Sequence, residues 1–209
     1  MKKRTGLYLS LFILIIVAVV SCSSHYIIPV SKMQPRLSFY GFTVARPPDT
    51  GWFVLLSEQK DDVARFRKKL PSTTHTAFVE INLRRMARAA TSLEDLVAID
   101  KEKHTVHDTL RYKMVNFTQT PTNRQGQWCV NWTERVIDRN PAQAPNTPLS
   151  LRSQGFRCIH PIYKSNRVIL EAEISERGLE GELDSLIIKE GEEILKSIML
   201  TDTMGVPFK

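Results

Sequence analysis

Histidines and an acid at three places in the chain could bind a metal ion. His104-Thr-Val-His107-Asp108 carries two imidazoles three residues apart and a carboxylate, and His75 and His160 lie elsewhere. A metal site needs ligands that converge as well as ligands of the right type. Nothing in the spacing indicates such convergence, so we expect solvent-exposed histidines at a helix end, and neither a metal nor another cofactor.

Catalytic motifs are equally scarce. The chain contains no HExxH, no GxSxG and no glycine-rich phosphate loop. Nucleophilic catalysis requires a base next to the nucleophile and a third group that orients the base. The sequence indicates no such pair of groups for Cys158 or for any serine. We therefore expect a protein that is not an enzyme.

The N-terminus has the layout of a secretory signal. Lys2, Lys3 and Arg4 precede an apolar run of about 14 residues, which is shorter than the roughly 20 that a transmembrane helix needs. Val19-Val20-Ser21-Cys22 resembles the bacterial lipobox. The resemblance implies a signal peptide over residues 1–21, cleavage before Cys22, and diacylglycerol and acyl chains such as palmitate on that cysteine. The alternative is an ordinary secreted protein in which Cys22 is incidental.

The same resemblance implies a location. Ser23, rather than an aspartate, follows the cysteine, which in Gram-negative sorting favours the outer membrane, with the chain facing the periplasm. Residues 22–37 show no clear period, and we expect them to form a lipidated tether. Residues 38–200 have the length of one globular domain, and residues 201–209 form a C-terminal tail.

Removal of the leader changes the charge. The formal net charge is +7, and three of these charges belong to residues 2–4, so the mature chain carries only about +4. This modest surplus, together with export, argues against nucleic acid as a partner. The basic run Arg65-Phe-Arg67-Lys68-Lys69 is the local exception. It indicates either a charged edge strand or turn, or a contact with anionic lipid headgroups.

Cys129 and Cys158 both lie in expected strands, on either side of a proline-rich loop over residues 140–148. If these strands form a hairpin, the residue numbers of every opposed pair add up to the same total. The number midway between 129 and 158 falls close to the centre of the loop, so the two cysteines would be opposed. The same register opposes Trp132 to Gly155 and, unfavourably, Arg135 to Arg152. We predict a Cys129–Cys158 disulfide, because the exported compartment is oxidising.

The remaining pattern is mostly strand, with two helices. One helix begins at the capping sequence Ser92-Leu-Glu-Asp95. The other, over about residues 184–199, has apolar residues at spacings of three and four. Strands are expected at about residues 39–45, 52–56, 75–83, 111–119, 127–137, 151–162 and 167–175. The order predicts an α+β domain in which helices cover a mostly antiparallel sheet.

Gly41-Phe-Thr-Val44, Pro47-Pro48 and Gly51-Trp52 resemble the opening strand and turn of the PsbP/Mog1-like family, and the Ser92 helix and the closing helix follow in that family's order. The resemblance implies an α/β/α sandwich. Family members include photosystem subunits, transport cofactors and envelope lipoproteins, so the fold leaves function open.

Three functions fit these observations. We favour a membrane-anchored, non-catalytic binding or assembly module for an envelope protein partner. The alternative is a carrier or sensor of an apolar or glycan ligand in a cavity between sheet and helix, where Trp52, Trp128 and Trp132 could line a groove if they are not core residues. An envelope hydrolase ranks last.

Overall fold

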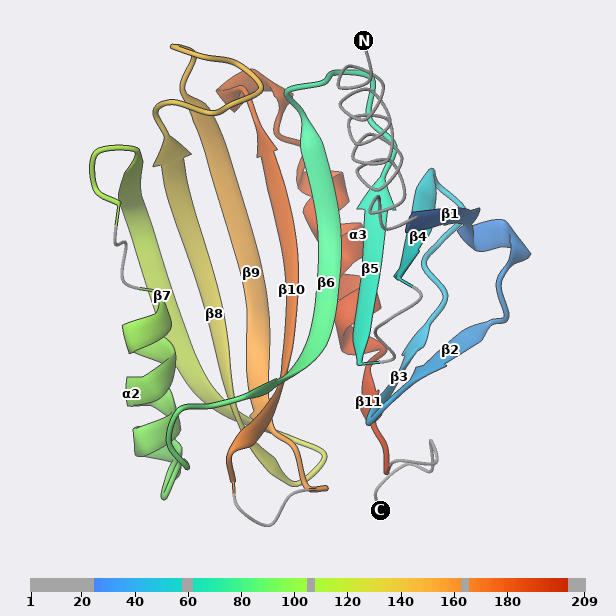
Figure 1. Ribbon diagram of the computed structural model, residues 1–209, viewed down its shortest axis with the longest axis vertical. Coiled ribbons are helices and arrows are strands. Elements are labelled where there is room, and N and C mark those ends of the chain that lie inside the picture. Colours follow the sequence, from blue (N-terminus) through green and yellow to red (C-terminus); the bar gives the residue numbers. More distant parts are fainter. Residues whose placement is uncertain (1–24, 58–61, 105–107, 163–165, 203–209) are drawn as a thin grey trace, which may run out of the picture.

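The structure is a computed structural model that describes residues 25–57, 62–104, 108–162 and 166–202. Its centre is an eight-stranded sheet in which all neighbouring strands run antiparallel (Figure 1). In spatial order the strands are β1 (His25–Pro29), β4 (Trp52–Ser57), β5 (Val63–Lys68), β6 (Thr76–Arg85), β10 (Val168–Gly178), β9 (Leu149–Ile159), β8 (Gln127–Asp138) and β7 (Tyr112–Arg124).

One face of this sheet is covered by α3 (Ser185–Lys196) and by a small sheet of β11 (Met199–Leu200), β3 (Phe42–Ala45) and β2 (Arg36–Phe39). The main core lies in this layer and includes Val79, Ile81, Leu170 and Ile174. Gly191 allows α3 to pack closely on the sheet, because a Cβ at this position would lie 2.4 Å from the side chain of Ile174.

The opposite face carries α2 (Leu93–Lys103), which packs on β7 and β8. Ser92 caps this helix and accepts a hydrogen bond from the Asp95 amide, as the capping sequence predicts, while the Asp95 carboxylate accepts from the Thr91 amide. A smaller apolar cluster that includes Leu96 and Val130 lies beneath the helix. The α2 helix covers only part of this face, and the rest of it is described below as the candidate site.

The predicted fold class is confirmed. The domain is α+β, its sheets are antiparallel, and helices lie on both faces of the large sheet. Both predicted helices are present. Two short 3-10 helices, η1 (Val30–Lys32) and η2 (Glu180–Glu182), complete the described elements. None of the helices within the described residues is long and apolar enough to cross a membrane.

The N-terminal boundary differs from the expected one. Residues 25–37 were expected to be tether, but β1 pairs with β4 along its whole length and β2 pairs with β3. Val30 and Leu37 are buried in the core. The segment lacks a recognisable period because it contains two short strands joined by a 3-10 turn, and each strand is too short to display one. At the other end, the tail was expected to begin at Thr201, yet this residue is fully buried and its amide donates to the Gly41 carbonyl oxygen.

The β8–β9 register is the one predicted from the sequence, with Trp132 opposite Gly155 and Arg135 opposite Arg152. The two arginines are accommodated because they pair with different acids, Arg135 with Glu180 and Arg152 with Glu176.

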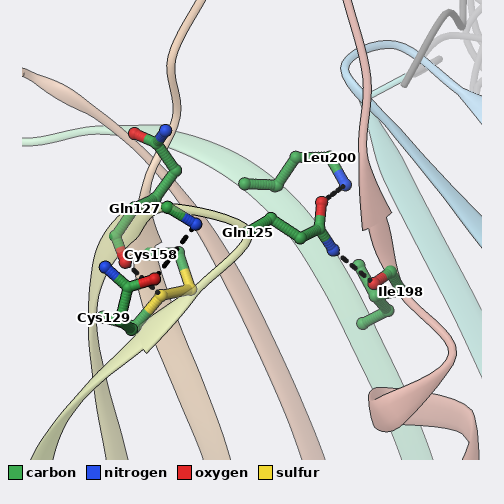
Figure 2. Close-up of a disulfide and its surroundings, with 8 residues drawn as sticks. Gln125, Gln127, Cys129, Cys158, Ile198 and Leu200 are labelled. Carbon is green, nitrogen blue, oxygen red and sulfur yellow. Dashed lines mark hydrogen bonds between the residues drawn. A yellow bond between two sulfur atoms is a disulfide. The ribbon is translucent and has the colours of Figure 1, made fainter. Parts of the chain in front are cut away.

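Cys129 and Cys158 are directly opposed and joined by a disulfide with an S–S distance of 2.05 Å. Figure 2 shows that the disulfide lies beside Gln125 in the β7–β8 turn. The Gln125 side chain donates to the Ile198 carbonyl oxygen and accepts from the Leu200 amide, at 3.1 and 2.9 Å. The turn therefore holds the segment that follows α3.

Candidate binding groove beside helix α2

The candidate site is a groove on the part of the sheet face that α2 leaves uncovered. It consists of two adjoining cavities of about 540 and 320 Å³, which share the lining residues Tyr112, Glu134, Leu151 and Glu173. Strands β6, β7, β8, β9 and β10 all contribute to the lining, and the larger cavity extends to the C-terminal end of α2. Cavities of a few hundred Å³ are of the size that binds ligands or inserted side chains.

Glu173 lies at the centre of this groove because β10 alternates. Glu171, Glu173 and Ser175 face the groove, whereas Ala172 and Ile174 face the core under α3. Glu173 is half-buried and forms no hydrogen bond or ion pair within the described residues. It is thus a carboxylate in a cavity without a partner.

The surroundings of Glu173 disfavour its charge. Burial, and then the carboxylates of Glu171 and Glu80, raise the pKa of Glu173 to about 7. Glu80 lies directly opposite on β6, and the opposite position on β9 is Gly155, which offers no side chain. The groove therefore has an acid at its centre that titrates near neutral pH.

The floor under α2 holds a paired cluster, which we call the Arg157 cluster. Arg157 is 3% exposed and donates to Glu171 from Nε and Nη2, at 3.1 and 2.8 Å, and to Asp100 from Nη1. Lys103 also pairs with Glu171. Burial alone would raise the pKa of Glu171, but the charges of Arg157 and Lys103 outweigh it and lower the pKa to about 2. The cluster fastens α2 to the sheet.

His104 belongs to the same floor, and the expectation that it is exposed to solvent is wrong. Its side chain is 7% exposed and packs between the rings of Phe117 and Trp132, at centroid distances of 4.6 and 4.4 Å. Nε2 accepts from Arg157 at 3.0 Å, so Nδ1 carries the proton and donates to Glu134 at 2.9 Å. His104 thus links Glu134 to the Arg157 cluster.

Apolar and aromatic side chains complete the groove. Tyr112, Met114, Val136 and Leu151 line the larger cavity, and Phe78, which is 38% exposed, lines the smaller one. The arrangement has an apolar wall and a few convergent polar groups, which is the composition of a binding site.

The other histidines do not meet at the groove. His75 bonds to the buried carboxylate of Glu176 at 2.7 Å, and His160 bonds to the Gly41 carbonyl oxygen, also at 2.7 Å. Burial lowers the pKa of His160, which keeps the ring neutral. His107 lies outside the described residues, and so does Cys22. No group of three or more His, Cys, Asp or Glu side chains within the described ranges is arranged to hold a metal ion.

Two of the three tryptophans are buried, and two side chains of the basic run form ion pairs within the domain. Trp52 and Trp132 are both 2% exposed, whereas Trp128 is 37% exposed and lies outside both cavities of the groove. The basic run was expected to be an edge strand or turn, but β5 lies inside the sheet between β4 and β6. Arg65 pairs with Glu80 and Lys68 pairs with Glu190.

Sequence reasoning did not find the groove. The available signal was in residues 169–177, where apolar and polar positions alternate and two glutamates occupy the polar face. An antiparallel strand with one polar face normally turns that face to solvent. Only the three-dimensional arrangement shows that α2 covers part of the face, buries Glu171 and leaves Glu173 in the groove.

No protein-family model matches the chain, and no curated protein matches it. Among solved structures, the chain is similar to a mutant form of Protein Mog1, with 12% identity, a TM-score of 0.45, and coverage of 81% of this chain and 96% of that one. It is similar to the Ran-binding protein Mog1p of Saccharomyces cerevisiae, with 12% identity, a TM-score of 0.43 and the same coverage. CyanoP, the cyanobacterial PsbP of Synechocystis, has 14% identity and a TM-score of 0.45, over 87% of this chain and 95% of that one. At this level of similarity the function has to be argued from the chain's own residues.

Proposed function

We propose that the chain is a lipid-anchored, non-catalytic binding module of the bacterial envelope, which holds a partner protein in the groove beside α2. The observation that carries the proposal is the groove itself. A sheet face that serves only the fold is either packed against other elements or turned to solvent as an open polar surface. Here it is hollow, has apolar walls, and contains the unpaired carboxylate of Glu173.

The anchor in this proposal is Cys22, on the outer membrane and facing the periplasm. The start of β1 changes the geometry that the sequence suggested. Because β1 begins at His25, three residues after Cys22, a lipid on Cys22 would hold the domain within about 10 Å of the headgroups. The partner would then have to approach close to the membrane surface. The disulfide between Cys129 and Cys158 supports an oxidising compartment of this kind.

A second function, as carrier or sensor of a small ligand, is supported by the volume of the larger cavity. About 540 Å³ lies within the range of ligand pockets, roughly 300 to 1,000 Å³. The cavity lies beside the C-terminal end of α2, whereas the sequence-based alternative placed it between the sheet and a helix. A protein partner is favoured because the two adjoining cavities extend across five strands, which suits an extended segment better than a compact ligand.

Site-specific photo-crosslinking in intact cells tests the proposal. A Phe78→p-benzoylphenylalanine variant places the probe in the groove, and a Leu186→p-benzoylphenylalanine variant places it on the exposed side of α3, where Leu186 is 58% exposed. We expect one reproducible protein adduct from the Phe78 probe, none of the same mass from the Leu186 probe, and loss of the adduct in a Cys22→Ala background. An adduct from Leu186 alone, or none from Phe78, would overturn the assignment of the groove.

A further inference from the structure

We infer that the groove receives a basic side chain, lysine or arginine, from the partner segment, with the cationic group against Glu173 and the alkyl stem along Tyr112 and Leu151. This inference rests on the proposed function and deepens it, because it names the chemistry by which the partner is recognised. It depends on three properties of the groove: its charge, its shape and its apolar wall.

The charge is negative where the two cavities meet. Every basic side chain in the lining already has an acidic partner: Arg84, Lys103 and Arg157 pair with Glu171, and Arg177 lies 4.0 Å from Asp138. Glu173 has no partner among the described residues. The Glu134 side chain, which lines both cavities, is bonded to the ring of His104 and to no lysine or arginine among the described residues. The one cation that lowers the pKa of Glu173 is Lys103, which is itself paired with Glu171, so the carboxylate of Glu173 would attract a further positive charge.

The shape leaves room for a cation at Glu173. On β9 the neighbouring positions are Gly155, opposite Glu173, and Ser153, whose hydroxyl is already bonded to Ser175 at 3.2 Å. Neither residue has a side chain long enough to reach the Glu173 carboxylate. Gly155 cannot be replaced by a larger residue without a clash, because a Cβ there would lie 2.2 Å from a backbone oxygen of β10. Position 155 therefore adds no side chain beside Glu173, and the room for a cation is that of the two cavities, which Glu173 lines and Gly155 does not.

The apolar wall suits the stem of a long basic side chain. Tyr112 and Leu151 line both cavities, and Phe78 lies at the far end of the smaller one. Lysine and arginine lay their methylene stems along apolar surface and keep the charge at the tip. An anionic segment would be repelled by Glu173, and a purely apolar segment would bury the Glu173 carboxylate without a partner, which is costly.

The test measures binding of blocked pentapeptides to the full purified chain in an uncharged detergent. The three probes differ at one central position, which is lysine, norleucine or glutamate between leucines. At pH 8 we expect the lysine peptide to bind at least about tenfold more tightly than the norleucine peptide, and the glutamate peptide to bind most weakly. The Glu173→Gln variant should lose the preference for lysine, while Glu102→Gln, an exposed control on α2, should keep it.

Affinity for the lysine peptide should also fall about tenfold from pH 8 to pH 6, because ionised Glu173 is the competent form and its pKa is about 7. The charged and titratable groups around Glu173 come from every neighbouring element: Glu80 and Arg84 on β6, Glu171 and Arg177 on β10, Arg157 on β9, Glu134 and Asp138 on β8, Tyr112 on β7, Lys103 at the end of α2, and His104 and Asp108 after it. The Glu173→Gln variant should lose this pH dependence, which separates the contribution of Glu173 to the change in affinity from that of the other groups.

Equal affinity for the lysine and norleucine peptides, no measurable binding of the lysine peptide, or an undiminished lysine preference in Glu173→Gln would overturn the inference. A Phe78 photo-adduct that persists alongside any of these results would show that the groove binds a partner of different chemistry. The proposed function would then stand without the inference.

Discussion

Replacement of Glu173 by glutamine should stabilise the fold, and the gain should depend on pH. The pKa of Glu173 rises from an ordinary 4.5 to about 7 in the folded chain. The folded state therefore holds its proton more tightly than the unfolded state does. Stability falls as pH increases through this interval and stays low above it. A difference of about 2.5 pKa units corresponds to roughly 3 kcal/mol at pH 8 and to less than about 1 kcal/mol at pH 5.

Urea denaturation of the purified protein at pH 5, 6, 7 and 8 measures this difference. We expect the Glu173→Gln variant to be more stable than the wild type by about 3 kcal/mol at pH 8, with the gap closing towards pH 5. The Glu102→Gln control, exposed on α2, should follow the wild type at every pH. A Glu173→Gln variant that is less stable than the wild type at pH 8, or a gap that does not change with pH, would refute the reasoning about the carboxylate.

Two other variants test the floor of the groove and the disulfide. Arg157→Met should destabilise the fold by about 3 to 5 kcal/mol, because Glu171 would remain buried without its main partner. Urea denaturation measures the loss, with Arg67→Met as a control at an exposed position. A loss below about 1 kcal/mol would show that the cluster does not fasten α2. The paired substitution of Cys129 and Cys158 by serine should lower the unfolding free energy by roughly 3 to 4 kcal/mol, as expected for opening a loop of this length. A denatured, non-reduced wild type that reacts with two equivalents of a thiol reagent would contradict the disulfide itself.

Much of the fold could be predicted because it follows from local patterns. The alternation in residues 75–83 and 127–137 specifies strands, and the Ser92 cap and the apolar spacing before Met199 specify helices. The β8–β9 register followed from the position of the loop between Cys129 and Cys158. The first strands could not be predicted in the same way, because four or five residues are too few to show a period, and their stability comes from pairing with β4 and β3.

The candidate site could not be predicted because it depends on which part of the sheet remains uncovered. His104 illustrates the difficulty. Its place at a helix end suggested exposure, yet the ring lies between Phe117 and Trp132, which come from two other elements. Glu173 is one acid among many in the sequence. Glu173 differs from the others because it lines both cavities of the groove and because the neighbouring bases Lys103 and Arg157 are already paired with Glu171.

The photo-crosslinking yield in intact cells, compared for the Phe78 and Leu186 probes with and without Glu173→Gln, tests the central claim most directly. The account predicts a single protein adduct from the Phe78 probe that weakens strongly when Glu173 is replaced, and no such adduct from the Leu186 probe. An adduct that forms equally from both probes, or only from Leu186, would contradict the claim that the groove beside α2 holds the partner.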